Sequence, residues 1–293
     1  MSTKKTPDIA AAERFLADRG RVVDRRTFER LFQGGAARPV KDAVAAYQNA
    51  DGGFGHALEP DCRASASQPA AVEMALRLLD MADAWDDGVA MAACDWLGAV
   101  APAEGGAAFV EATVSEGPHA PWWVPEEGHP TSLIQTGQLA GALHARGVRH
   151  PWLDGATAVM WDMIERLSEP GAYPMLGVCR FLDHVPDRAR AEAAFEKAGP
   201  LLLERGLVAL DPEAAGEVHT PLEFAPLPGS IGRHLFDEQT ITAHLDHLAA
   251  SQREDGGWMF SWPSWSPAAE ADWRGFLTVD ALLVLRANGR LRR

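Results

Sequence analysis

Apolar residues recur at spacings of three and four along most of the chain, which is the period of one buried helix face. In residues 40–49, for example, Ala43, Val44 and Tyr47 fall on one face, and Pro39 occupies a first-turn position. The pattern predicts an all-α fold with helices over residues 7–18, 24–33, 40–49, 67–82, 87–99, 131–146, 151–166, 172–184, 187–205, 237–251 and 274–288.

The connections between these helices fall into two classes. Several are only a few residues long, whereas residues 50–66, 100–130, 206–236 and 252–273 form long connections. If consecutive helices are antiparallel, the long connections gather at one end of the helix pairs, where helical repeats usually carry their sites. We therefore expect residues 1–293 to form a single α/α toroid domain, a closed ring of about six antiparallel helix pairs; an open solenoid is the alternative.

The long connection formed by residues 206–236 is rich in proline. Residues 206–236 contain four prolines, so a regular inner helix is not expected there.

Two segments about two hundred residues apart share the pattern Gln-x-x-Asp-Gly-Gly-aromatic. They are YQNADGGFGHAL, residues 47–58, and SQREDGGWMFSW, residues 251–262. Glycine supplies positive φ without steric cost, and an Asp side chain accepts hydrogen bonds from the N–H groups of a turn. We expect a structural turn in which Gln48 and Gln252 bond to helix ends, Asp51 and Asp255 bond to the turn, and Phe54 and Trp258 pack between helix pairs.

The second segment, within LDHLAASQREDGGW, resembles the Gln-Trp repeat of squalene-hopene and oxidosqualene cyclases. The first, AYQNADGGFG, resembles the related turn of those cyclases and of protein prenyltransferase β subunits. The resemblance implies an α/α toroid. It covers about fifteen residues at each turn, and the helix-pair rhythm extends it over most of the chain.

The catalytic motifs of those families are not matched. The cyclases carry an Asp-x-Asp-Asp acid motif, but Asp83, Asp86 and Asp87 have a different spacing and lie on a short connection. We expect these three to form a solvated turn and helix cap. The prenyltransferases bind zinc through Asp, Cys and His with Asp and Cys one residue apart, whereas Asp61 and Cys62 are adjacent. No cofactor is expected, because neither zinc nor magnesium has a convincing ligand set.

The amino-acid composition limits the classes of partner that we expect. Hydrophobic residues make up 47% of the chain and charged residues 23%, and the net charge is −14. An acidic surface repels phosphate backbones, so nucleic acid is not an expected partner. No apolar run reaches the roughly 18 residues that span a bilayer, and no signal peptide is recognisable. The three cysteines are far apart, which favours reduced thiols and a cytoplasmic location.

The first long connection, GFGHALEPDCRASASQP, concentrates ionisable groups. His56, Glu59 and Asp61 are the catalytic candidates, because two close carboxyl groups raise the pKa of one of them and create a general acid. Arg63 would hold the other carboxylate or grip an anionic group. The alternative is that Glu59 and Asp61 pair with Arg63 and cap the next helix.

Aromatic side chains mark the other long connections. Tryptophan faces suit an apolar or cationic ligand, and sugars stack on them equally well. The alternative is a small core beneath long loops. The irregular segment 206–236 adds a histidine and a glutamate. The substrate-binding candidates are Arg63, Trp122, Trp123, His129, His219, Glu223, Trp258, Trp262, Trp265 and Trp273.

These features leave three hypotheses open. The first is an enzyme acting on a small apolar, isoprenoid-like molecule in a toroid cavity, with a carboxylic acid donating a proton and tryptophans stabilising carbocation charge. The second is a carbohydrate-active enzyme, which predicts two carboxyl groups facing each other across an open polar groove. The third is a non-catalytic module that binds a lipid or a protein.

Overall fold

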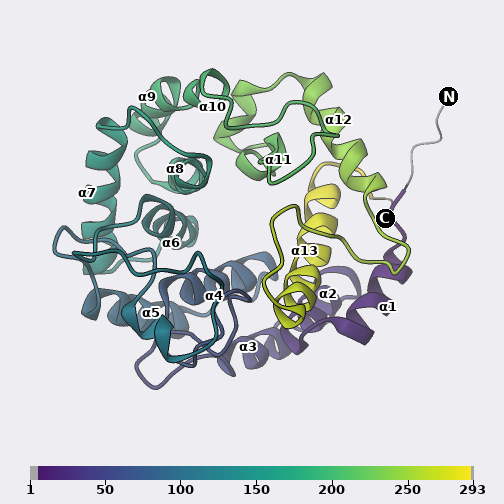
Figure 1. Ribbon diagram of the computed structural model, residues 1–293, viewed down its shortest axis with the longest axis horizontal. Helices are drawn as coiled ribbons and strands as arrows, with labels where there is room; N and C mark the ends of the chain where they lie inside the picture. Colours follow the sequence, from purple (N-terminus) through teal and green to yellow (C-terminus); the bar gives the residue numbers. More distant parts are fainter. Residues whose placement is uncertain (1–5, 292–293) are drawn as a thin grey trace. The chain divides into compact units, whose positions relative to one another are not determined.

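The computed structural model describes residues 6–291, and these residues confirm the all-α prediction (Figure 1). Within that range there are no strands, only isolated backbone bridges such as the one between Gln48 and Phe54. The contacts divide the chain into two compact units. We call residues 37–201 unit 2, and the described residues 6–36 and 202–291 unit 1. No helix in the described part of the chain is long and apolar enough to cross a membrane.

Unit 2 is an array of antiparallel helices in two layers. Helices α4, α6 and α8 pack side by side in one layer, and α5, α7 and α9 form the other (Figure 1). Each first-layer helix continues through a short connection into its second-layer partner. The helices are α3 (Arg38–Ala45), α4 (Pro69–Met81), α5 (Asp87–Ala99), α6 (Leu133–Ala145), α7 (Pro151–Glu165), α8 (Ala172–His184) and α9 (Arg188–Ala198).

The closest contact in unit 2 is between α6 and α8. A methyl group at Gly137 would lie 2.4 Å from the carbonyl oxygen of Gly177, and one at Gly177 would lie 2.5 Å from that of Leu133. Glycine is therefore required on both helices for their backbones to touch. Hydrophobic side chains such as Leu139 and Phe181 are completely buried in these helices.

Unit 1 combines the two ends of the described chain. Its longest helix, α13 (Pro267–Ala287), packs against α1 (Ile9–Arg19), α2 (Val22–Phe32) and α12 (Glu238–Ala250). Phe276 and Leu282 of α13 are buried in this core. The short helix α11 (Pro221–Phe224) contacts α12, and a 3-10 turn, η2, spans Ile231–Leu235. Helix α10 (Leu201–Glu204) lies at the boundary between the units.

Most predicted helices are found within a few residues of their expected bounds, but two predictions were wrong. The helix expected over 187–205 is interrupted, because Pro200 after Gly199 has no N–H for helix continuation, and α9 ends at Ala198. The helix expected over 274–288 begins earlier, at Pro267, where Ser266 caps it. Trp273 therefore lies on α13 and not in a loop. As expected, residues 206–236 hold no long helix.

The two Asp-Gly-Gly turns have the same internal hydrogen bonds. In the first, the Gln48 side chain donates to the Gly52 carbonyl at 3.0 Å, and Asp51 accepts from the Gly53 N–H at 2.9 Å. Gly52 has a φ of +92°, in the region that favours glycine. The second turn repeats these contacts at 2.9 and 3.1 Å, with a φ of +96° at Gly256, through Gln252, Gly256, Asp255 and Gly257. This confirms that the repeated motif is a structural turn.

Each turn is pressed against the backbone of a helix. A methyl group at Gly52 would lie 2.5 Å from the carbonyl oxygen of Ala92 on α5. In unit 1, a methyl group at Gly256 would lie 2.2 Å from the carbonyl oxygen of Ala11 on α1. The aromatic residues that follow the turns, Phe54 and Trp258, are buried as expected. The motif thus fastens a helix end to a neighbouring helix pair within each unit.

The turns differ in what holds their aspartates. Asp51 accepts from the Ser67 hydroxyl at 2.8 Å, whereas Asp255 binds the Arg274 guanidinium at 2.7 Å. Burial alone would raise the pKa of Asp255, but hydrogen bonds from Arg274 and from the Gly257 N–H outweigh it and lower the pKa. The second turn is therefore closed by an ion pair, and the first is completed by uncharged groups.

The acidic cluster on the short connection is a helix cap, as predicted. Asp86 is the N-cap of α5 and accepts from the N–H groups of Gly88 and Val89. A hydrogen bond from Lys41, together with these N–H groups, lowers the pKa of Asp86.

Replacing Gly52 by alanine tests the requirement for glycine in the turn. The Gly52→Ala variant should unfold at lower denaturant, losing about 2 kcal/mol or more, because it combines an unfavourable φ with a backbone clash. Gly155→Ala is the matched control, since Gly155 lies within α7 with nothing within 4 Å of the added methyl group. The control should be neutral or stabilising by up to about 1 kcal/mol. Equal stability of the two variants would contradict the role assigned to Gly52.

A charged cluster joins α4, α6 and α8 beside the short connections. Asp80 binds Arg146 at 2.6 Å and Arg180 at 3.2 Å. Burial, followed by the positive charge of Arg180, lowers the pKa of His184 from 6.5 to about 4. Burial also lowers the pKa of His144. Both histidines are partly buried.

The depressed pKa of His184 predicts a loss of stability in mild acid. The unfolded chain takes up a proton near pH 6.5 and the folded chain only near pH 4, so the free energy of unfolding should fall as pH decreases through this window. Because His184 is partly solvated, we expect it to contribute about 1–2 kcal/mol between pH 7 and pH 5. Denaturant unfolding of His184→Gln at both pH values should show a smaller fall than the wild type. The same change at exposed His247 should leave the fall unchanged.

Candidate functional site

The first two long connections of unit 2 run alongside each other. The Arg63 N–H donates to the Pro118 carbonyl at 2.9 Å, and the Ala120 N–H donates to the Asp61 carbonyl at 2.8 Å. An isolated antiparallel bridge joins Cys62 to His119 between these bonds. Two segments separated by more than a whole helix pair therefore meet, as expected of connections at the same end of the array.

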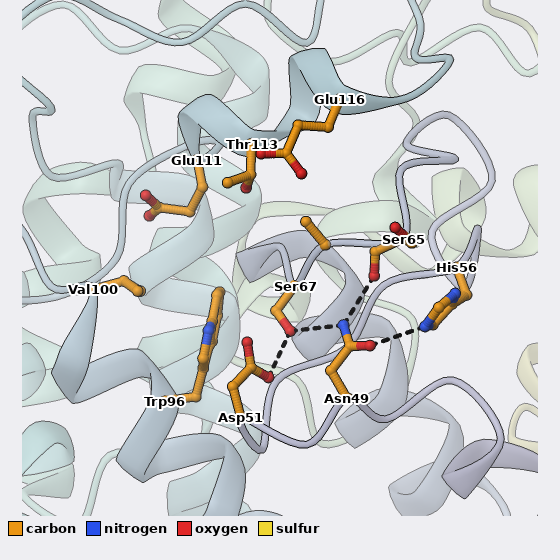
Figure 2. Close-up of a pocket in the computed structure, with 11 residues that line it drawn as sticks. Asn49, Asp51, His56, Ser65, Ser67, Trp96, Val100, Glu111, Thr113 and Glu116 are labelled. Carbon is orange, nitrogen blue, oxygen red and sulfur yellow. Dashed lines mark hydrogen bonds between the residues drawn. The ribbon is translucent and has the colours of Figure 1, made fainter.

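An open pocket of about 500 Å³ lies between these connections. Figure 2 shows Glu111, Thr113 and Glu116 on one wall and Asn49, Asp51 and His56 on the other. Trp96 of α5 flanks the pocket beside Asp51. Its lining residues include three carboxylates and no lysine or arginine. Such a lining disfavours anions and suits ligands that are cationic or rich in hydroxyl groups.

The wall formed by the first connection is a continuous hydrogen-bonded chain. The Asn49 amide nitrogen donates to the Ser65 carbonyl and to the Ser67 hydroxyl, both at 2.9 Å (Figure 2). Ser67 in turn donates to Asp51. Because its amide nitrogen is used in this way, Asn49 presents its Oδ1 atom to Nε2 of His56, 2.9 Å away.

This arrangement fixes the tautomer of His56. A side-chain carbonyl oxygen only accepts, so Nε2 of His56 carries the proton, and in the neutral ring Nδ1 is the acceptor. His56 has a φ of +57° and an exposed side chain. Holding a non-glycine residue in this region costs energy, which is common where a side chain is positioned for binding or chemistry. His56 is the catalytic candidate that the structure places in the pocket.

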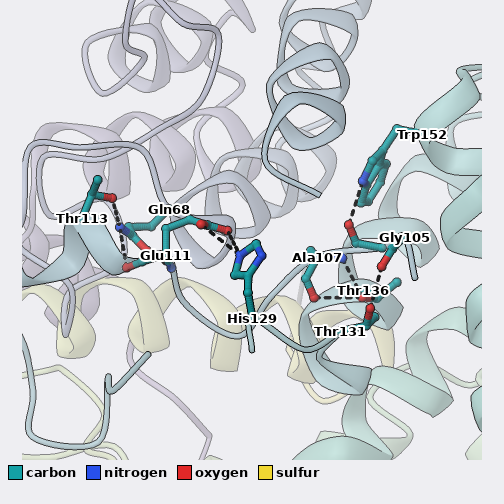
Figure 3. A network of polar contacts seen from close by, with 10 residues as sticks. Gln68, Gly105, Ala107, Glu111, Thr113, His129, Thr131, Thr136 and Trp152 are labelled. Carbon is teal, nitrogen blue, oxygen red and sulfur yellow. Dashed lines mark hydrogen bonds and ion pairs between the residues drawn. The ribbon is translucent and has the colours of Figure 1, made fainter. Parts of the chain in front are cut away.

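The opposite wall is held by Gln68, which precedes α4. Gln68 is buried; its Oε1 accepts from the Glu111 N–H at 2.8 Å, and its Nε2 donates to the Thr113 hydroxyl at 2.9 Å (Figure 3). His129 contacts both carboxylate oxygens of Glu111, at 3.0 and 3.1 Å. The predicted binding residue His129 therefore acts on the pocket indirectly, by orienting the Glu111 carboxylate.

The rest of the second connection is tied to α6 and α7. The Thr136 hydroxyl bonds both the N–H and the carbonyl of Ala107, and the Thr131 hydroxyl donates to the Gly105 carbonyl (Figure 3). The indole of Trp152 donates to the Gly106 carbonyl. These bonds give a long segment without regular structure a fixed path, so that Glu111 and Glu116 project from a defined backbone.

The other two catalytic candidates lie outside this pocket. Glu59 and Asp61 are buried, with 4% and 5% exposure, beside Cys62. Burial, followed by the negative charge of Glu59, raises the pKa of Cys62 to about 12, and Asp61 adds to the effect. Arg63 is half-buried, and its backbone joins the two connections. Neither Glu59 nor Asp61 lines the pocket of about 500 Å³.

The two adjacent tryptophans of the second connection have different surroundings. Trp122 is 41% exposed, whereas Trp123 is buried and stacks on Phe109 with ring centroids 4.8 Å apart. The buried indole N–H of Trp123 has no hydrogen-bond acceptor among the described residues. Neither residue lines the pocket.

The remaining tryptophan candidates belong to unit 1. Trp258 is buried in the second turn and donates to the Leu248 carbonyl at 2.8 Å, so it is part of the core. Trp262 stacks on Phe260 at 4.5 Å and meets Trp273 edge-on at 5.2 Å. Together with Phe276 these rings form a small aromatic cluster, and Trp265 is half-buried nearby in the sequence.

His219 and Glu223 form a local pair in unit 1. Nδ1 of His219 lies 3.0 Å from Glu223, whose other oxygen accepts from the Thr220 N–H in a capping box at the start of α11. These bonds complete the cap at the start of α11. His244 is likewise buried and bonds to the Leu210 carbonyl.

No group of metal-ligating side chains is found within residues 6–291. All three cysteines are buried free thiols, and burial raises the pKa of each. Thiolate nucleophiles and thiolate metal ligands are therefore disfavoured in the folded chain.

Sequence reasoning did not select several residues that line the pocket. Glu111 precedes a 3-10 turn, η1 (Ala112–Glu116), and Glu116 is its last residue, inside a connection whose apolar pattern gave no signal. Trp96 lies within a regular helix, where an aromatic residue is usually part of the core. The sequence does not show that the two connections, 40 or more residues apart, lie next to each other in the fold.

The sequence itself gives no further guide to the family. No protein-family model matches the chain, and a search of curated proteins found no significant match.

Replacing Gln68 tests whether it holds the carboxylate wall. In Gln68→Met, loss of the bonds to Glu111 and Thr113 should speed amide hydrogen exchange over residues 111–117 by about tenfold or more, since each bond is worth about 1 kcal/mol. Exchange in α6 and α8 should not change. Gln138→Met, on α6, is the control. Uniformly faster exchange throughout unit 2 would show a general loss of stability and contradict a local role.

Proposed function

We propose that the pocket of unit 2 binds a small hydroxyl-rich molecule of the carbohydrate class, and that the protein is an enzyme acting on it. The observation that carries this proposal is the open polar pocket in which Glu111 and Glu116 face Asn49, Asp51 and His56 (Figure 2). The lining mixes carboxylate, amide and hydroxyl groups, which recognise sugar hydroxyls by accepting and donating hydrogen bonds. The ring of Trp96 supplies an apolar surface beside them.

Carboxyl groups lie on both walls of the pocket, Glu111 and Glu116 on one and Asp51 on the other, and this supports hydrolysis of a glycosidic bond. In such reactions one carboxyl group protonates the leaving oxygen, and a second carboxylate activates water or attacks the sugar. We assign the second role to Glu111, because His129 orients both of its carboxylate oxygens. Glu116 makes no hydrogen bond or ion pair with the described residues, and we assign it the role of proton donor to the leaving oxygen. His56, with its acceptor Nδ1, is a further base on the opposite wall.

The alternative is an enzyme acting on an apolar, isoprenoid-like molecule. It is supported by the resemblance of the two turns to those of triterpene cyclases and by the aromatic cluster of Trp262, Trp273 and Phe276 in unit 1. In this alternative the helix pairs close into an α/α toroid, and Glu59 or Asp61 supplies the acid. The polar pocket favours the carbohydrate hypothesis, since an isoprenoid would leave its carboxylates unpaired.

The two hypotheses predict different ligands. The purified chain should bind or cleave members of a panel of oligosaccharides in saturation-transfer NMR and reducing-sugar assays, and it should not bind polyprenyl alcohols or diphosphates. Glu116→Gln should reduce turnover about 100-fold or more, as expected for loss of a general acid. Glu111→Gln should reduce it to a similar extent.

Glu104→Gln is the matched control, because Glu104 is exposed on the same connection outside the pocket. It should retain full activity. Full activity of Glu111→Gln and Glu116→Gln would overturn the assignment of roles. Saturable binding of a polyprenyl compound, with no saccharide bound, would replace this proposal by the isoprenoid alternative.

A further inference from the structure

Unit 1 contains a second pocket, of about 310 Å³, between α12, the segment that precedes it and the C-terminal end of α13. Its floor is apolar: Phe236, Ile241 and Leu245 line it and are buried. Arg233, Glu238 and Arg290 line the same pocket. A compact apolar floor with a few charged groups is the usual composition of a small-molecule site.

The guanidinium of Arg233 is rigidly held but not neutralised by contact. Its Nε donates to the Ala225 carbonyl at 2.9 Å, and its Nη2 donates to the Pro226 carbonyl and to Oδ1 of Asn288. All three acceptors are uncharged. Within the described chain, Nη1 makes no hydrogen bond and Arg233 makes no ion pair. These hydrogen bonds hold the guanidinium in a fixed orientation, and its Nη1 group is available to donate to a carboxylate.

Glu238 is the complementary group. Its negative charge interacts electrostatically with Arg233 and partly opposes the lowering of the Arg233 pKa by burial. The two side chains nevertheless do not come within ion-pair distance, and Glu238 makes no hydrogen bond or ion pair with residues 6–291. Arg233 and Glu238 thus carry opposite charges in one small pocket but form no ion pair with each other.

The remaining charge in the pocket is already satisfied. Arg290 binds Asp246 of α12 at 2.8 Å, so it contributes little net charge. The pocket therefore presents one open cation, Arg233, and one open anion, Glu238, above an apolar floor. A ligand with a single negative charge would be repelled by Glu238, and a ligand with a single positive charge would be repelled by Arg233.

We infer that this pocket is a site for a free α-amino acid with an apolar side chain. Arg233 would bind the carboxylate through Nη1, Glu238 would accept from the ammonium group, and the side chain would lie on Phe236, Ile241 and Leu245. The Thr242 hydroxyl, which makes no hydrogen bond among the described residues, lies in the same lining. The volume is enough for one amino acid and too small for a folded partner.

The inference is tested with the full chain and L-leucine as the probe, by isothermal titration calorimetry. Two analogues separate the charges: L-leucinamide lacks the carboxylate, and 4-methylpentanoate lacks the ammonium group. Each should bind at least about tenfold more weakly than L-leucine, because each loses a charge-assisted hydrogen bond and keeps one repulsion.

The variant Glu238→Gln removes the proposed ammonium acceptor from an exposed position and leaves the bonds of Arg233 intact. It should weaken L-leucine at least about tenfold while leaving 4-methylpentanoate unchanged or tighter. Glu254→Gln, an equivalent change at an exposed residue of unit 1 outside the pocket, should bind L-leucine normally. Absence of L-leucine binding up to millimolar concentration, equal binding of either analogue, or an unaffected Glu238→Gln would overturn the inference. None of these results depends on the pocket of unit 2.

Discussion

The close approach of a glycine in a left-handed turn to the carbonyl of a neighbouring helix is the constraint on which both units depend. At Gly52 and Gly256 the backbone conformation and the available space each exclude a side chain. The adjacent aspartate then completes the turn by accepting from its N–H groups. Because this contact fixes where the chain leaves a helix, it also fixes the start of each connection that follows. In unit 2 that connection carries Asn49, Asp51 and His56 into the pocket.

The same turn is used twice in different surroundings, and in unit 2 it borders the candidate site. In unit 1 the turn is sealed by the ion pair of Asp255 with Arg274, whose guanidinium also covers the ring of Phe15. In unit 2 the equivalent position is occupied by the Ser67 hydroxyl, and the neighbouring Asn49 turns its amide to His56. In unit 2 small uncharged groups thus take the place of the ion pair, and the pocket lies beside them. The polar pocket therefore lies where the hydrogen-bond partners of the turn differ between the two units.

The sequence predicted the helices well because their apolar positions repeat with a helical period. It predicted the two turns well because Asp-Gly-Gly after a helix is typical of a turn with positive φ. Its errors have two sources, local start and stop signals that the apolar pattern obscured and tertiary contacts between distant segments. Pro200 ended a helix whose apolar pattern continued, and Ser266 began one before its pattern became clear. Charge density along the chain singled out Glu59 and Asp61, but these are buried, and of the three catalytic candidates only His56 lines the pocket. Glu111 and Glu116, on the opposite wall, belong to a distant segment, and no local sequence pattern indicates that the two segments lie close together.

The division of unit 1 between the two ends of the chain has a consequence for synthesis. Helices α1 and α2 bury their apolar faces against α13, which begins more than two hundred residues later. A ribosome adding about 5–20 residues per second needs roughly 10–50 s to cover that interval. Throughout it α1 and α2 are without this partner, whereas all residues of unit 2 are present once residue 201 has been added. The residues of unit 2 are thus complete before those of unit 1, and the apolar faces of α1 and α2 wait longest for their partner.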